Sequence, residues 1–119
     1  MSDDESISWR KLREFADVDL TKSFVLSWHT DGDALLIDID LYLEAEHPFY
    51  ERPRPAEKNC IRPATIRFPY CEVIENLEEL GNGAISDLRV LDDGRYAISG
   101  EFGTVLVIAE RPILRLTGP

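Results

Sequence analysis

The chain has few of the side chains that bind transition metals, with two cysteines and two histidines among 119 residues. Cys60 and Cys71 show no metal-binding or redox spacing, and two cysteines are too few for a disulfide framework. A zinc site would need at least one more ligand near His29 or His47, and no spacing supplies one. We therefore expect no metal, no cofactor and two reduced thiols, which is typical of a cytoplasmic protein.

Long apolar runs are also missing. No stretch approaches 18 consecutive apolar residues, so no membrane span is expected. Residues 1–5 read MSDDE, which is acidic where a secretory signal is basic and then hydrophobic. We expect residues 1–7 to form a disordered acidic lead and residues 8–119 to form one domain of common size.

Basic residues are scarce, because 13 lysines and arginines face 23 acidic residues and the formal charge is −10. Such a surface would repel nucleic acids and anionic membranes. Segment 31–46 holds six acidic residues and no base, whereas segment 52–67 holds five bases and one acidic residue. Either the basic segment neutralises the acidic one as a neighbouring strand, or the acidic surface meets a basic partner.

Nucleophilic catalysis needs a nucleophile, a base and an oxyanion-binding backbone, and the chain shows no such set. The serines stand outside any nucleophile-elbow motif. Cys60 with His47 is the one pair to weigh, but Cys60 shares its parity with the inward-facing Ala64 and is expected to be buried and inert. The glycine-containing segments 81–83 (GNG) and 100–103 (GEFG) lack the lysine of a phosphate-binding loop. We predict no catalytic residues.

The clearest pattern that is present is an alternation over residues 34–46. The aliphatic residues of one parity are Leu35, Ile37, Ile39, Leu41 and Leu43, and the other parity holds Asp38, Asp40, Tyr42 and Glu44. Side chains alternate between faces along a strand, so this run predicts a half-buried β-strand. A metal-binding or acid–base role for Asp38 and Asp40 is the alternative to outward positions in water.

A second alternating run precedes the first one. Residues 22–30 predict a strand that carries Phe24, Leu26 and Trp28 on one side. Asp31-Gly32 is a tight-turn signal that would join this strand to residues 34–46 as a hairpin.

The rest of the chain indicates a mainly β fold. Further strands are expected at residues 60–68, 84–91, 95–99, 104–109 and 113–117. Apolar residues at three- and four-residue steps over 8–18 predict a short helix with Ser8 as its N-cap. We expect one antiparallel β-sandwich or partly open β-barrel of seven to eight strands with a short N-terminal helix.

Residues 46–59 are rich in proline and are expected to form a long loop. Its aromatic and arginine side chains are typical of a contact surface, although a loop packed over the end of a barrel would also need them. With the carboxylates of the preceding strand, the predicted partner-binding residues are Asp38, Asp40, Glu44, His47, Phe49 and Tyr50.

The leading hypothesis is a non-catalytic acidic protein that binds a protein partner, such as a basic toxin or enzyme. The alternative is a small-molecule-binding barrel whose cavity is lined by Phe24, Trp28, Phe68 and Phe102, although core packing also explains these aromatic residues. A third alternative is an enzyme that uses the loop at His47.

Three short segments carry a resemblance. The segments at residues 23–28 (SFVLSW), 47–50 (HPFY) and 64–69 (ATIRFP) are similar to those of small uncharacterised bacterial β-proteins. Some proteins of that kind resemble immunity proteins of contact-dependent toxin systems. The resemblance implies a cytoplasmic non-enzyme, and no functional residue can be transferred from it.

Overall fold

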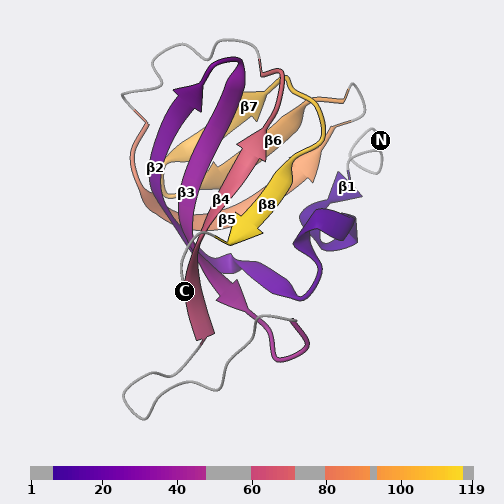
Figure 1. Ribbon diagram of the computed structural model, residues 1–119, viewed down its shortest axis with the longest axis vertical. Helices are drawn as coiled ribbons and strands as arrows, with labels where there is room; N and C mark the ends of the chain where they lie inside the picture. The colour runs from indigo at the N-terminus through magenta and orange to yellow at the C-terminus, as the bar shows by residue number, and fades with distance from the viewer. Residues whose placement is uncertain (1–6, 48–59, 72–79, 92–93, 117–119) are drawn as a thin grey trace.

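The computed structural model describes residues 7–47, 60–71, 80–91 and 94–116 (Figure 1). Within these residues the chain forms strands and two short 3-10 helices, η2 and η3. The elements are β1 (Ile7–Ser8), η2 (Trp9–Lys11), η3 (Arg13–Phe15), β2 (Val18–Asp31), β3 (Ala34–Leu43), β4 (Cys60–Phe68), β5 (Gly83–Val90), β6 (Tyr96–Gly100), β7 (Gly103–Val107) and β8 (Ile113–Leu116). None of the helical turns among these residues is long and apolar enough to cross a membrane.

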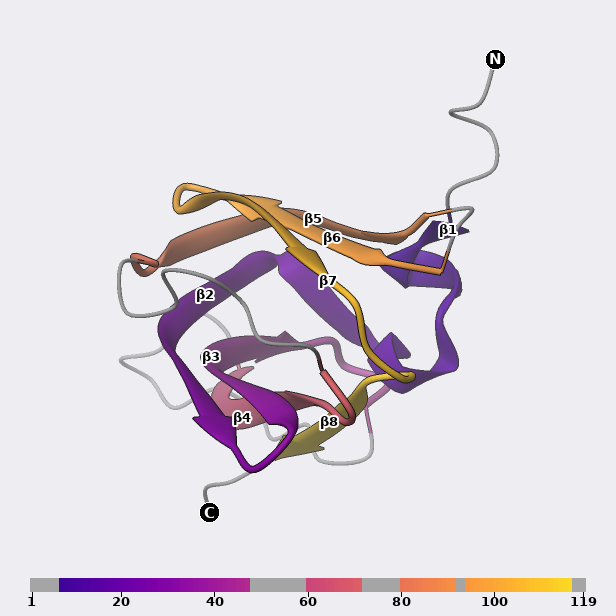
Figure 2. The same ribbon diagram turned by 90° about the horizontal axis from the view of Figure 1, so that it is seen from above.

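The strands form one antiparallel sheet in the order β7-β6-β5-β2-β3-β4-β8, with β1 paired to β5. The terminal strands β7 and β8 are not paired with each other, so the sheet is open. Figure 2 shows that the sheet curls, with β5, β6 and β7 in one layer facing β3, β4 and β8, while β2 leads from one layer to the other. The predicted mainly β, antiparallel fold of seven to eight strands is confirmed.

The alternation predicted for residues 34–46 is confirmed over β3. Its odd-numbered aliphatic side chains are buried in the core, and its even-numbered residues from Leu36 to Tyr42 are half-buried on the other face, whereas Ala34 at the start of the strand is buried. The expected hairpin is also present, because Asp31 pairs with Ala34 across a turn in which Gly32 has φ of 62°. This left-handed conformation suits glycine in a tight turn. Strand β4 places Ala64, Ile66 and Phe68 inward, as expected.

The alternation predicted for β2 is wrong, because the strand contains a bulge. Val25 pairs with Ile39 and Ser27 pairs with Asp38, so Leu26 is an extra residue that shifts the parity of the strand. Val25 and Trp28 therefore face the core, whereas the side chains of Phe24 and Leu26 are exposed.

The predicted N-terminal helix over residues 8–18 is also wrong. Its place is taken by β1, η2 and η3, and Leu12 between the two helical turns has extended backbone angles. The turns direct Trp9 and Phe15 into the core, where both are 2% exposed. Burial of two large aromatic side chains outweighs the local helical spacing. The Ser8 side chain does cap η2, by accepting a hydrogen bond from the Arg10 amide.

Strand β1 is the first element of the described part of the chain. Ile7, which the sequence assigns to the acidic lead, is the first residue of β1 and pairs with Val90 of β5. The rest of the predicted lead, residues 1–6, lies outside the described residues.

Candidate functional site

The outward side of β2, β3 and β4 carries the carboxylates of the predicted site. We call this surface the outer face, and its central row is formed by Leu36, Asp38, Asp40 and Tyr42 of β3. The register places Ser27 of β2 and Thr65 of β4 on either side of Asp38. One step along β3, Phe24 and Pro63 flank Asp40 in the same way.

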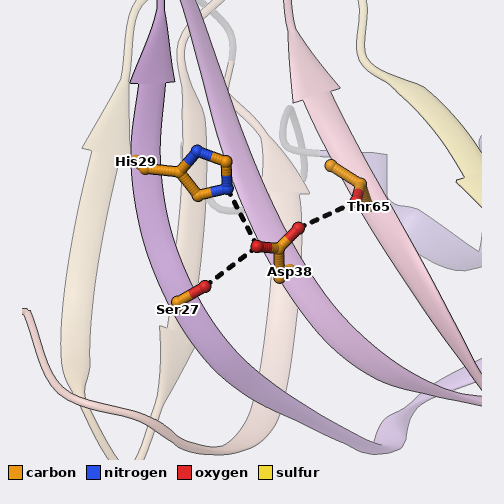
Figure 3. Close-up of polar contacts among 4 residues, drawn as sticks. All are labelled: Ser27, His29, Asp38 and Thr65. Atoms are coloured by element: carbon orange, nitrogen blue, oxygen red, sulfur yellow. Dashed lines mark hydrogen bonds and ion pairs between the residues drawn. The ribbon is translucent and has the colours of Figure 1, made fainter. Parts of the chain in front are cut away.

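Asp38 is the centre of a hydrogen-bonded cluster that joins three strands (Figure 3). Thr65 Oγ1 donates to Asp38 Oδ1 over 2.8 Å, and Ser27 Oγ donates to Asp38 Oδ2 over 3.0 Å. His29 Nε2 lies 2.8 Å from the same Oδ2 atom. Both oxygens of the Asp38 carboxylate therefore have partners within the protein.

These contacts set the electrostatics of Asp38, whose side chain is 39% exposed. Partial burial raises the pKa of the carboxyl group, but the hydrogen bonds from Thr65, His29 and Ser27 outweigh it. The net result is that the pKa of Asp38 lies below its ordinary value, with a smaller contribution from the charge of His29. Asp38 thus stays ionised over the physiological pH range.

The cluster is a hydrogen-bonded carboxylate and does not have the order of a catalytic triad. In a triad the histidine lies between the nucleophile and the carboxylate. Here Ser27 Oγ donates to Asp38, and His29 binds the same Asp38 oxygen as Ser27 does. In the described part of the chain there is also no group of three or more histidine, cysteine, aspartate or glutamate side chains that could hold a metal ion.

Asp40 has a different environment from Asp38. Asp40 is half-buried, and its carboxylate forms no ion pair and no side-chain hydrogen bond with any residue that the structure describes. Its cross-strand neighbours are apolar: Phe24, whose side chain is 39% exposed, and the exposed Pro63. Leu26, at 45% exposure, adds a second large apolar group to β2 on this face.

Basic residues of the neighbouring strands neutralise the acidic segment only in part. Arg67 of β4 lies 3.7 Å from Asp31 at the end of β2. Lys22 places its Nζ atom 4.9 Å from the centroid of the Tyr42 ring. Across from Asp38 and Asp40, however, β4 presents Thr65 and Pro63 rather than a base. Among the residues that the structure describes, the cross-strand pairing of charges that the sequence suggests therefore does not reach these two aspartates.

The other predicted site residues lie beyond the carboxyl end of β3. Glu44 is exposed, and its backbone amide donates to the carbonyl of Asp17. His47 is half-buried; burial lowers its pKa, and the nearby Asp17 carboxylate opposes that shift. Glu44 is four residues from Asp40, which is about 13 Å along an extended chain. Predicted residues Phe49 and Tyr50 lie outside the described residues.

The aromatic residues weighed as a cavity lining do not gather at one place. Phe68 is fully buried and Trp28 is 9% exposed, and both belong to the core cluster. The Trp28 ring meets Phe102 edge to face at a centroid distance of 5.1 Å, and its Nε1 donates to the Gly81 carbonyl. Phe24, in contrast, lies on the outer face.

Sequence reasoning missed Ser27, His29, Thr65 and Phe24 as members of the site. A usable signal was present in the hairpin turn: if Asp31 pairs with Ala34, counting outward places Ser27 opposite Asp38. His29 then falls on the same face, two residues away. Predicting that Thr65 lies beside Asp38 would have required the register between β3 and β4, which no short turn fixes.

Comparison with known proteins gives no relative from which a function for the site could be inferred. The chain matches no protein-family model, no curated protein and no solved structure.

Proposed function

We propose that this chain is a non-catalytic protein that binds a basic protein partner through the outer face of β2, β3 and β4. The observation that carries the proposal is the environment of Asp40, a half-buried residue whose carboxylate has no partner among the described residues and which lies beside the exposed Phe24. A basic side chain of a partner would pair with this carboxylate, while the partner's apolar groups would cover Phe24 and Leu26. Charged groups give such a contact its specificity, and aromatic groups supply much of its affinity.

The net charge of −10 supports a basic partner over other macromolecules. It would speed the encounter with a positively charged protein and would repel nucleic acid and anionic membranes. A cytoplasmic location and an immunity-like role against a basic toxin or enzyme form part of the same proposal. The resemblance to small bacterial β-proteins supports only the cytoplasmic, non-enzymatic part of this proposal.

The experiment begins with affinity capture from the native cytoplasm and identification of the protein that co-purifies. Binding kinetics of that protein are then measured for the wild type, for Asp40→Asn and for the control Asp33→Asn. The control removes the same charge from an exposed position in the hairpin turn, away from Phe24. We expect Asp40→Asn to slow association and speed dissociation, because the pair would be partly desolvated.

The control variant is expected to change association only slightly, because the charge it removes is exposed and screened by water. A captured partner that is acidic, or one whose kinetics are the same with Asp40→Asn as with the wild type, would overturn the proposal.

A further inference from the structure

We infer that the group that the partner presents to Asp40 is an arginine, held between the carboxylate of Asp40 and the ring of Phe24. This inference rests on the proposed function, because it names the side chain that the outer face recognises. Arginine and lysine both carry a positive charge, so the choice between them depends on the surroundings of Asp40.

A row of four residues crosses four adjacent strands at this point. Ala84 of β5 pairs with Phe24, Phe24 pairs with Asp40, and Asp40 pairs with Pro63 of β4. Directly paired residues have Cβ atoms about 4.5–5.5 Å apart, so neighbouring side chains in the row can contact one ligand group together. Asp40 is the single charged member of the row, and it stands between an aromatic ring and a proline ring.

Asp40 rather than Asp38 is the carboxylate available to a partner. Asp38 already accepts hydrogen bonds at Oδ1 from Thr65 and at Oδ2 from Ser27, with His29 at the same oxygen. The Asp40 carboxylate has no such partner among the described residues. A cation that approaches the outer face therefore meets no competing hydrogen-bond donor at the Asp40 carboxylate among the described residues.

The apolar row favours a guanidinium over an ammonium group. A guanidinium is planar and weakly hydrated, it stacks on an aromatic face, and it can donate two parallel hydrogen bonds to one carboxylate. An ammonium is strongly hydrated and would lose that water against Phe24 and Pro63. The neighbouring ring of Tyr42 is already covered by the chain's own Lys22, which leaves Phe24 as the open ring beside Asp40.

The test uses two labelled peptides of equal length and charge, one alternating glycine with arginine and the other glycine with lysine. Their dissociation constants are measured by fluorescence anisotropy at low ionic strength with the intact chain. We expect the arginine peptide to bind about two- to fivefold more tightly, the range that a cation–π contact at an exposed site supports. Asp40→Asn should weaken the arginine peptide on the order of tenfold, and Asp38→Asn should weaken it much less.

Phe24→Leu is the matched variant for the ring, because it keeps an apolar side chain and removes the aromatic face. We expect it to weaken the arginine peptide to the level of the lysine peptide and to leave the lysine peptide unchanged. Amide NMR shifts of Phe24 and Asp40 on titration, with Leu106 of β7 as the distant reference, report whether the peptide lies on the outer face.

The outcomes separate the two proposals. Equal affinity of the two peptides, with both dependent on Asp40, would overturn the arginine inference and support the proposed basic-partner face. Equal losses from Asp38→Asn and Asp40→Asn would overturn the assignment of the contact to Asp40. Failure of both peptides to bind, or binding that shifts Leu106 rather than Phe24 and Asp40, would overturn the proposed function together with the inference.

Discussion

The ring of Phe68 on β4 lies against the ring of Tyr96 on β6, with centroids 5.2 Å apart and planes tilted by 59°. In the order of the sheet, β3, β2 and β5 all separate β4 from β6. The two rings meet because the sheet curls and brings its two layers face to face (Figure 2). This contact therefore joins the two layers of the core across the open sheet. The ring of Phe24, in contrast, lies on the outer face.

The two phenylalanines give a direct test of which face is the core. Phe68→Ala removes a fully buried ring and is expected to lower the free energy of unfolding by about 3–5 kcal/mol. Phe24→Ala removes a ring on the outer face and should cost less than about 1 kcal/mol. Urea unfolding of the two variants measures both values, and similar losses would contradict the outward placement of Phe24.

A second stability prediction concerns Gly100, at the end of β6. A Cβ atom at this position would run into the Ala84 carbonyl oxygen and the ring of Phe102. The Ala84 oxygen also accepts a hydrogen bond from the Glu101 amide, so it cannot move freely. We expect Gly100→Ala to lower the free energy of unfolding by about 1–3 kcal/mol.

Gly81→Ala is the control for that variant, because a Cβ atom at Gly81 would meet open space. It should change stability by less than about 1 kcal/mol. Urea midpoints measured side by side provide the comparison, and a loss at Gly81 as large as the loss at Gly100 would show that steric contact is not the cause.

The fold was predictable from sequence where local patterning and burial agree. Strand β3 alternates without interruption, and the Asp31-Gly32 turn sets its hairpin with β2. The face of Phe24 was not predictable, because a bulge at Leu26 depends on how β2 pairs with its neighbour. The N-terminal segment was mispredicted because Trp9 and Phe15 reach the core from two separate turns, and helical spacing cannot distinguish that arrangement from one continuous helix.

The site was predictable only where a single strand determines it. Asp38 and Asp40 follow from the parity of β3, which places both on the outer face. Their different roles do not follow, because they depend on Thr65 and Pro63 of β4 and on which of the two aspartates has hydrogen-bond partners. These are contacts between residues distant in sequence, and their register is set by the assembled core.

The charge of the chain predicts how salt affects its stability. At −10 the folded state repels itself, and salt weakens that repulsion. Ion pairs such as Arg67–Asp31 are largely exposed and contribute little that salt could remove. We expect the melting temperature at neutral pH to rise or stay unchanged between about 0.01 and 0.1 M sodium chloride, where the screening length falls from about 30 to 10 Å.

Glu110→Gln removes one exposed charge outside the outer face, so it should reduce this salt dependence slightly. A melting temperature that falls with salt would mean that favourable ion pairs dominate, and the view of the surface as self-repelling and acidic would be wrong.

The pKa of Asp38 depends on its cross-strand hydroxyl groups. Burial raises this pKa, and the hydrogen bond from Thr65 is the largest of the contacts that lower it. Thr65→Val removes that donor and should raise the pKa toward its ordinary value of 3.8 or above it. Carboxyl ¹³C NMR titration measures the change, and Thr30→Val serves as the control because Thr30 has no contact with Asp38.

The same shift predicts how Asp38 contributes to stability as a function of pH. Because the folded-state pKa is lowered, the ionised carboxylate stabilises the fold fully above about 3.8, the unfolded value, and this contribution is lost as the pH falls through the folded-state pKa. The stability difference between wild type and Asp38→Asn should therefore shrink as the pH falls below about 3.8. Urea unfolding across this range measures it. A difference that persists unchanged at pH 2 would show that the carboxylate charge does not stabilise the cluster of Ser27, His29 and Thr65.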